Sequence, residues 1–74
     1  MNPLEGRSAN HFTMAFTEFE FLVDFGQAYE PSAEPFIHTR IILTPHSART
    51  LSEMLREIVR QYEQSVGPIQ HRKA

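Results

Sequence analysis

The sequence has no cysteine and no tryptophan, and it has only three glycines among 74 residues. Without cysteine, the chain has neither a disulfide framework nor a thiolate zinc site. A domain of this length buries only about 60% of the surface of its unfolded chain, so its own core is marginal. Oligomerisation is a usual way to stabilise such a small domain, and the composition therefore predicts a dimer or a larger assembly.

An excess of positive charge is also missing, because seven Lys and Arg stand against nine Asp and Glu. This balance gives nucleic acid no attraction to the chain as a whole. Apolar runs fall far short of the ~20 residues of a membrane-spanning helix, and residues 1–8 lack the apolar region of a secretory signal. We therefore expect a cytoplasmic protein that does not enter a membrane and has no general affinity for nucleic acid.

The sequence does contain alternating apolar residues, which fall at every second position from Phe19 to Phe25. Alternation of this kind is typical of a strand with one buried face. Residues 12–16 alternate in the same way, and a hairpin with Thr17 and Glu18 as its loop residues places both apolar sets on one face. A longer loop of the same parity has the same effect, because only an odd slip in register turns a strand over.

A third alternating segment runs from Phe36 to Leu43, after a surface loop at residues 26–35 that is either a contact region or an insertion. Its pairing with the central strand is expected to set Asp24 opposite His38. We expect an inner face with Ile37, Thr39, Ile41 and Leu43. The outer face is the candidate surface for a partner protein, and its predicted residues are Glu20, Leu22, Asp24, Phe36, His38, Arg40 and Ile42.

A long helix is predicted from Pro45 to Val66. Thr44 suits the N-cap, Pro45 suits the first helical position, and Gly67 followed by Pro68 ends the helix. The apolar sector is roughly 140° wide, which exceeds the ~100° stripe of a helix with one partner. We expect the extra width to contact a second chain through Met54, Val59 and Tyr62.

These elements predict an α+β fold, a three-stranded antiparallel β-meander followed by one long C-terminal helix packed on one face, and a homodimer. The domain spans residues 10–67, between flexible tails at 1–9 and 68–74. Two dimer geometries remain open. Either the helices pair through Met54 and Val59, or edge strands join into a continuous sheet.

Several short motifs lie along these elements, namely E-F-x-x-D-F-G, H-T-R-I-I-L, T-P-x-x-A-x-x-L and Y-E-x-x-x-G-P-I. Together they resemble a family of short bacterial proteins of unknown function over roughly residues 10–69. The resemblance implies a small cytoplasmic α+β protein, without a known activity, substrate or catalytic residue. The matching positions are Glu18 or Glu20, Phe19 to Gly26, Arg40 to Pro45, Ala48, Leu51, Leu55, Tyr62, Glu63, Gly67 and Ile69.

No catalytic or metal-binding pattern stands out. No pair among His11, His38, His46 and His71 has the i, i+4 spacing of helical metal ligands, so we expect no metal and no cofactor. Asp24 and His38 are better interpreted as a structural pair than as an acid and a base. The phenylalanines are better interpreted as core residues than as a stacking platform for bases.

The leading hypothesis is a small non-enzymatic, homo-oligomeric interaction module that acts as an adaptor, scaffold or regulator of an unidentified protein. The alternative is a dimeric ribbon-type nucleic-acid-binding regulator, in which paired strands enter the major groove. A small enzyme would require a site built between subunits.

Overall fold

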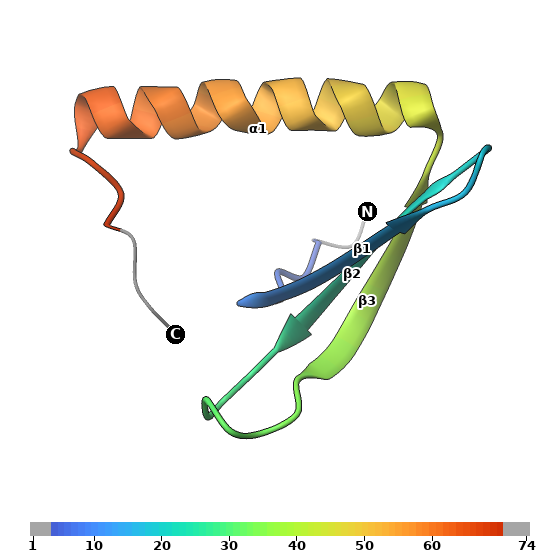
Figure 1. The fold of residues 1–74 in the computed structure, drawn as a ribbon. Coiled ribbons are helices and arrows are strands. Elements are labelled where there is room, and N and C mark those ends of the chain that lie inside the picture. The colour runs from blue at the N-terminus through green and yellow to red at the C-terminus, as the bar shows by residue number, and fades with distance from the viewer. Residues whose placement is uncertain (1–3, 71–74) are drawn as a thin grey trace.

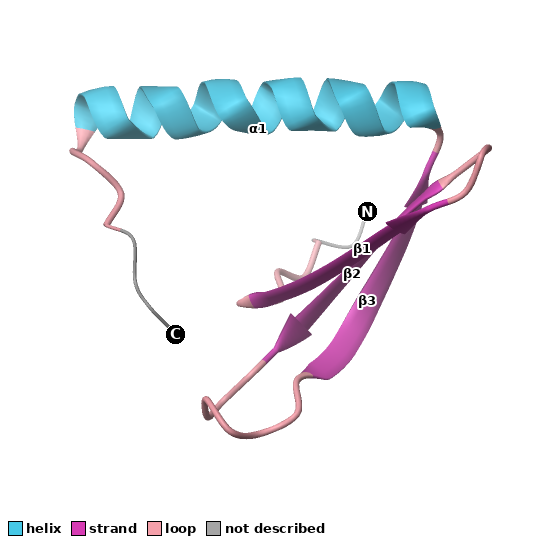
Figure 2. Ribbon diagram, viewed as in Figure 1, coloured by secondary structure: helices cyan, strands magenta, loops and turns pink. Residues whose placement is uncertain are grey.

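A computed structural model describes residues 4–70 and contains the elements β1 (His11–Phe16), β2 (Phe21–Gln27), β3 (Phe36–Leu43) and α1 (Pro45–Ser65), in that order (Figure 1). The strands form an antiparallel sheet in the order β1-β2-β3, drawn in magenta beside the cyan helix in Figure 2. The predicted order of elements and the antiparallel meander are therefore confirmed.

The turn between β1 and β2 is longer than expected. Phe16 pairs with Phe21, so the loop has four residues, from Thr17 to Glu20. The two-residue loop is therefore wrong, and the alternative of a longer loop with the same parity is confirmed. The Thr17 hydroxyl accepts hydrogen bonds from the backbone N–H groups of Phe19 and Glu20, at 3.2 and 3.1 Å. This local bonding stabilises the wider turn. Phe19, expected in the central strand, lies in the turn and is 73% exposed.

The parity of the hairpin is nevertheless as expected, since the actual register differs from the predicted one by two residues. The large apolar side chains of β1 and β2 therefore share one face, which we call the inner face. The opposite side is the outer face. The inner face consists of three cross-strand rows, Phe16–Phe21–Leu43, Met14–Val23–Ile41 and Phe12–Phe25–Thr39.

A β-bulge interrupts the pairing of β2 with β3. Phe25 pairs with Thr39 but Gly26 pairs with Ile37, which leaves His38 as the extra residue. The bulge shifts the faces of the residues before it, so that Phe36, paired with Gln27, joins the inner face and Ile37 joins the outer face. The sequence placed both residues on the opposite sides, because strict alternation was assumed.

The bulge brings two backbones together at Gly26. A Cβ atom at this position would lie 2.6 Å from the carbonyl oxygen of Phe36 and 2.8 Å from Cδ1 of Ile37. Only glycine fits such an approach without displacement of the neighbouring strand.

The helix starts as the sequence predicts. Thr44 is the N-cap, and its hydroxyl accepts a hydrogen bond from the Ser47 N–H at 3.1 Å. Pro45 occupies the first turn, where its missing N–H leaves no bond unmade. Val66 is the C-cap, and Gly67 follows with a φ of 140°.

The helix diverges from the sheet instead of lying on it. In Figure 1, α1 leaves the corner where β3 ends and separates from the strands along its length. β3 provides the main contact between helix and sheet, and within residues 4–70 Gly26 alone is buried. The expected packing of the helix on the inner face is thus not made inside this chain. The reason is local, because Thr44 alone connects β3 to α1.

The inner face and the apolar stripe of α1 consequently remain open to solvent. Met14 and Phe16 are 73% and 77% exposed on the sheet, and Leu55 is 60% exposed on the helix. The inner face still has internal order, because Phe12 and Phe25 pack edge to face across the strands with their ring centroids 5.8 Å apart.

The segment before β1 is hydrogen-bonded to the sheet. The Asn10 side chain donates to the Ala28 carbonyl at 2.9 Å and accepts from the Ala28 N–H at 2.7 Å. His38 Nε2 donates to the Ser8 carbonyl at 3.0 Å, and Arg7 donates to the His38 carbonyl at 3.4 Å. Residues 1–3 and 71–74 of the two predicted tails lie outside the described residues.

Candidate interaction surface

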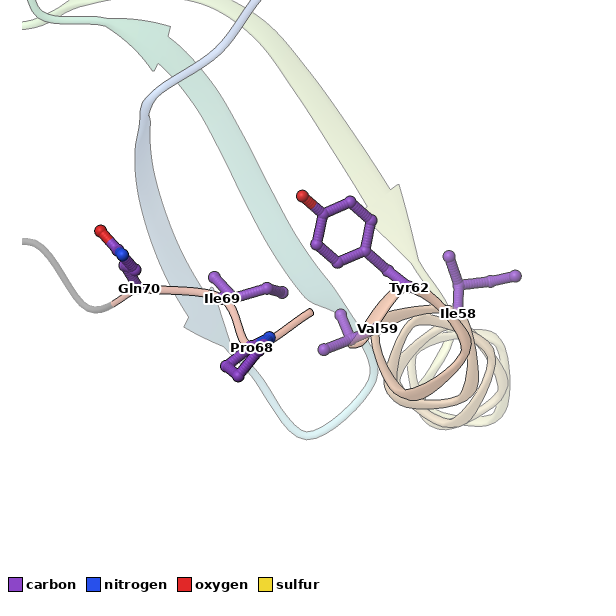
Figure 3. Close-up of a pocket in the computed structure, with 6 residues that line it drawn as sticks. All are labelled: Ile58, Val59, Tyr62, Pro68, Ile69 and Gln70. Carbon is purple, nitrogen blue, oxygen red and sulfur yellow. The ribbon is translucent and has the colours of Figure 1, made fainter. Parts of the chain in front are cut away.

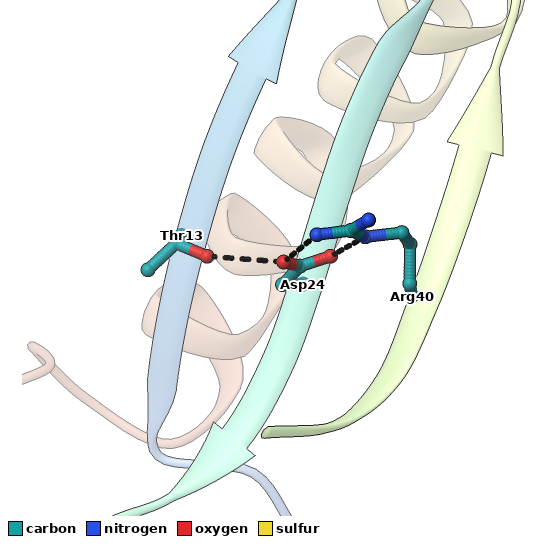
Figure 4. A network of polar contacts seen from close by, with 3 residues as sticks. All are labelled: Thr13, Asp24 and Arg40. Atoms are coloured by element: carbon teal, nitrogen blue, oxygen red, sulfur yellow. Dashed lines mark hydrogen bonds and ion pairs between the residues drawn. The ribbon is translucent and has the colours of Figure 1, made fainter. Parts of the chain in front are cut away.

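The centre of the outer face is a charged network that spans all three strands. Arg40 on β3 donates two hydrogen bonds to the Asp24 carboxylate on β2, from Nε to Oδ1 at 2.7 Å and from Nη2 to Oδ2 at 2.9 Å. Thr13 on β1 adds a long contact of 3.5 Å from its hydroxyl to Oδ2. Figure 4 shows this row on the side of the sheet that faces away from the helix.

This network corrects the predicted partner of Asp24. Asp24 lies directly opposite Arg40, whereas the sequence placed it opposite His38, which is the bulged residue. His38 turns instead toward Thr39, with Nδ1 at 2.7 Å from the threonine hydroxyl, and toward the Ser8 carbonyl. The geometry therefore gives no acid–base pair between Asp24 and His38.

The ion pair shifts the pKa values of both of its members. The Arg40 guanidinium, chiefly through its hydrogen bonds, holds the pKa of the Asp24 carboxyl below its usual value of 3.8. The Asp24 carboxylate in turn raises the pKa of the Arg40 guanidinium above its ordinary value, chiefly by accepting its hydrogen bonds. Both groups are thus charged at neutral pH, and a two-bond geometry of this kind fixes the register of β2 against β3.

An apolar pair adjoins the network. Leu22 pairs with Ile42 across β2 and β3, and Ile42 is 56% exposed. Glu20 lies at the end of the turn before β2, two residues before Leu22. Four of the seven residues predicted for partner binding therefore share one part of the outer face. Of the other three, Glu20 lies in the turn, His38 is the bulged residue and Phe36 lies on the inner face. The four are Leu22, Asp24, Arg40 and Ile42.

Two residues of the outer face were absent from the predicted partner surface. Thr13 completes the charged row, and Ile37 covers Gly26 beyond it. The glycine inside a strand pattern was an available signal, since such a glycine often marks a bulge or a close backbone approach. That signal would have moved Ile37 to the outer face.

The helix carries a second candidate surface near its C-terminal end. There the segment after Gly67 turns back beside α1 and encloses a shallow groove of about 610 Å³. Figure 3 shows Val59 and Tyr62 of the helix on the side of the returning segment, and the Ile69 N–H donates to the Glu63 carboxylate at 3.1 Å. The residues that line the groove are Ile58, Val59, Tyr62, Pro68, Ile69 and Gln70.

The predicted oligomer-interface residues are only partly brought together. Val59 and Tyr62 share the groove, but Met54 does not line it and is 63% exposed. Along the length of α1 the centre of the helix stripe is Leu55, midway between Pro45 and Ser65, with Leu51 one turn before it and Ile58 one turn after it. The sequence analysis already placed these three residues in the apolar sector, but predicted that they pack on the sheet of their own chain.

Between residues 4 and 70, no three His, Asp or Glu side chains gather into a group that could hold a metal ion. None of the helices in that part of the chain combines the length and the apolarity needed to cross a membrane.

Acid should remove the contribution of Asp24 to stability. Its pKa in the folded state lies below 3.8, so above pH 3.8 the carboxylate is charged in both the folded and the unfolded chain and its contribution is complete. Below pH 3.8 the unfolded chain binds the proton first, and the contribution is lost. We expect Asp24→Asn to lower the Tm by a few degrees at neutral pH and by less in acid. Thermal unfolding of both proteins across this range checks the expectation.

Glu57→Gln is a control for this experiment. Arg60, with help from Gln61, lowers the pKa of Glu57 from 4.5 to about 2 through side-chain hydrogen bonds on the helix. The difference in Tm between this variant and the natural chain should therefore be complete above pH 4.5 and should disappear as the pH falls from 4.5 to about 2. A difference between Asp24→Asn and the natural chain that stays constant with pH would contradict the assigned ion pair.

Comparison with known proteins gives one match. No curated protein and no solved structure matches the chain. Residues 4–71, which include the sheet, the helix and the returning segment, match the sequence profile of the proteins of unknown function named DUF3467. The expectation of a family without an assigned function is thereby confirmed, and the chain belongs to the DUF3467 family.

Proposed function

We propose that this protein is a non-enzymatic, self-associating interaction module that binds another protein through the outer face of its sheet. The observation that carries the proposal is the pairing of Leu22 with Ile42 next to the Asp24–Arg40 ion pair. An apolar centre beside a fixed polar network is the usual composition of a protein-binding surface.

The remaining surfaces support self-association. The inner face and the helix stripe present large apolar side chains of the kind that soluble monomers rarely expose together. They lie on the opposite side of the sheet from the ion pair (Figure 4). Self-association through the inner side would thus leave the outer face available for a partner.

A protein partner suits the outer face better than nucleic acid does. A ribbon-type regulator needs cations that are free to contact phosphates and bases. Arg40, at the centre of the outer face, is engaged in two hydrogen bonds with Asp24.

Affinity capture with a matched pair of variants tests this function. We expect the natural chain to retain a specific protein from a lysate of the source cells, and Ile42→Lys to lose it, because the lysine interrupts the apolar pair. Gln64→Lys, which adds the same charge on the polar side of α1, should retain it. Equal retention by both variants would place the binding elsewhere, and no specific protein with the natural chain would contradict the proposal.

A further inference from the structure

The chain exposes far more surface than a compact protein of its mass. Its accessible surface is 7176 Å² at 8.6 kDa, whereas a compact monomer of this mass exposes about 4,700 Å². Its radius of gyration is 14.8 Å, against about 11 Å for a compact chain of this length. The excess of about 2,500 Å² equals the upper end of the area that each chain contributes to a large obligate dimer, which buries roughly 2,000–5,000 Å² in total, half of it from each chain.

The two uncovered surfaces, the inner face of the sheet and the apolar stripe of α1, are suited to pack against each other. One chain presents an apolar sheet face that needs a helix, and a helix with an apolar stripe that needs a sheet. The helix has 21 residues, a length of about 31 Å, and the longest strand has 8 residues, a length of about 27 Å. One helix is therefore long enough to cover one sheet from end to end.

The connection between β3 and α1 keeps the helix away from its own sheet. The connection is Thr44 alone, whose backbone is extended at φ −68° and ψ 158°. Pro45 restricts Thr44, the residue before it, to extended backbone, and the bond from the Ser47 N–H holds the threonine side chain in its capping position. Strand-to-helix connections normally contain 2–6 residues, and short hinges of this kind favour exchange of an element between chains.

We infer that the inner face of each sheet is covered by α1 of a second copy of this chain, in a reciprocal helix exchange around a twofold axis. Each copy then supplies one sheet and one helix, so the same contact forms twice and the assembly closes as a dimer. This inference rests on the self-association proposed above and specifies its geometry. It differs from a dimer of paired helices and from a dimer of joined strand edges, because both of those leave the inner faces uncovered.

Lengthening the hinge tests the exchange without altering either apolar surface. Gly-Gly-Ser-Gly inserted between Leu43 and Thr44 leaves the helix cap intact and gives the helix enough reach to fold onto its own sheet. We expect the natural chain to sediment at twice 8.6 kDa and the insertion variant to sediment as a helical, folded monomer at the same concentration. A dimer that persists unchanged in the insertion variant would overturn the exchange but not the self-association. A monomeric natural chain would overturn both the exchange and the self-association. The capture experiment with Ile42→Lys would still test the outer face separately.

Cross-linking provides a second readout that does not depend on the insertion variant folding. The chain has no native cysteine, so Met14→Cys with Leu55→Cys places two unique thiols on the sheet and on the helix. A short bismaleimide should join them between chains and give a covalent dimer on a denaturing gel. Thr13→Cys with Leu55→Cys, whose sheet thiol lies on the outer face, should link poorly. Links within one chain, or equal yields from the two pairs, would overturn the exchange.

Discussion

Leu55→Glu should dissociate the proposed homodimer. Leu55 lies at the centre of the helix stripe and is 60% exposed in the single chain, so its removal costs the chain itself little. In a twofold dimer the side chain is buried twice, and each burial is worth about 2 kcal/mol. The loss of about 4 kcal/mol corresponds to a roughly thousandfold weaker dimer. Sedimentation equilibrium measures the dissociation constant, and circular dichroism on the same samples measures the helix content.

Gln64→Glu is the matched control for Leu55→Glu. It introduces the same carboxylate on the polar side of the same helix, so we expect a dissociation constant close to that of the natural chain. Equal weakening by the two substitutions would indicate an effect of net charge. A Leu55→Glu chain that dimerises as well as the natural chain would exclude the helix stripe from the interface.

The second large effect is expected at Gly26. Gly26→Ala would place its new Cβ atom 2.6 Å from the Phe36 carbonyl oxygen, so β2 and β3 must separate at the bulge. Overpacking of this kind typically costs 1–3 kcal/mol, and we expect about 2 kcal/mol here because the nearest atom is backbone and cannot rotate away. Chemical denaturation at a fixed protein concentration gives the free energy of unfolding that checks this value.

Two further variants identify the cause of that loss. Gly6→Ala should be neutral, because nothing lies within 4 Å of a Cβ at that position. Ile37→Ala combined with Gly26→Ala should recover only part of the loss, since it removes the contact at 2.8 Å but not the one with the carbonyl oxygen. Full recovery in the double variant would contradict the backbone clash as the main cause.

The sequence was most informative where the signal is local. Thr44 and Pro45 predicted the start of the helix to the residue, because capping and the missing proline N–H act within one turn. The alternation around Phe21 predicted the faces of β1 and β2, even though the turn is two residues longer than expected. Only parity matters for which side of a sheet a residue occupies.

Interactions between distant segments were less predictable. The bulge at His38 depends on how two strands meet, and a steady alternation conceals it. The Asp24–Arg40 pair follows from the resulting register, so the sequence named both residues but assigned the wrong partner. The position of α1 away from its own sheet could not be predicted for a different reason. An apolar stripe indicates that a surface will be covered, but does not specify whether the same chain or another one covers it.

The near-absence of buried residues within one chain has a consequence for how the protein persists in a cell. If most of the burial occurs between chains, folding is governed by mass action, and the fraction of folded protein falls as the protein is diluted. A newly made chain at low abundance would be mostly open and accessible to proteases, whereas an abundant one would be protected by its own copies. Gly26 is the one buried residue among those described, so if the proposed dimer supplies the missing burial, the abundance of this protein would set a threshold for its own survival.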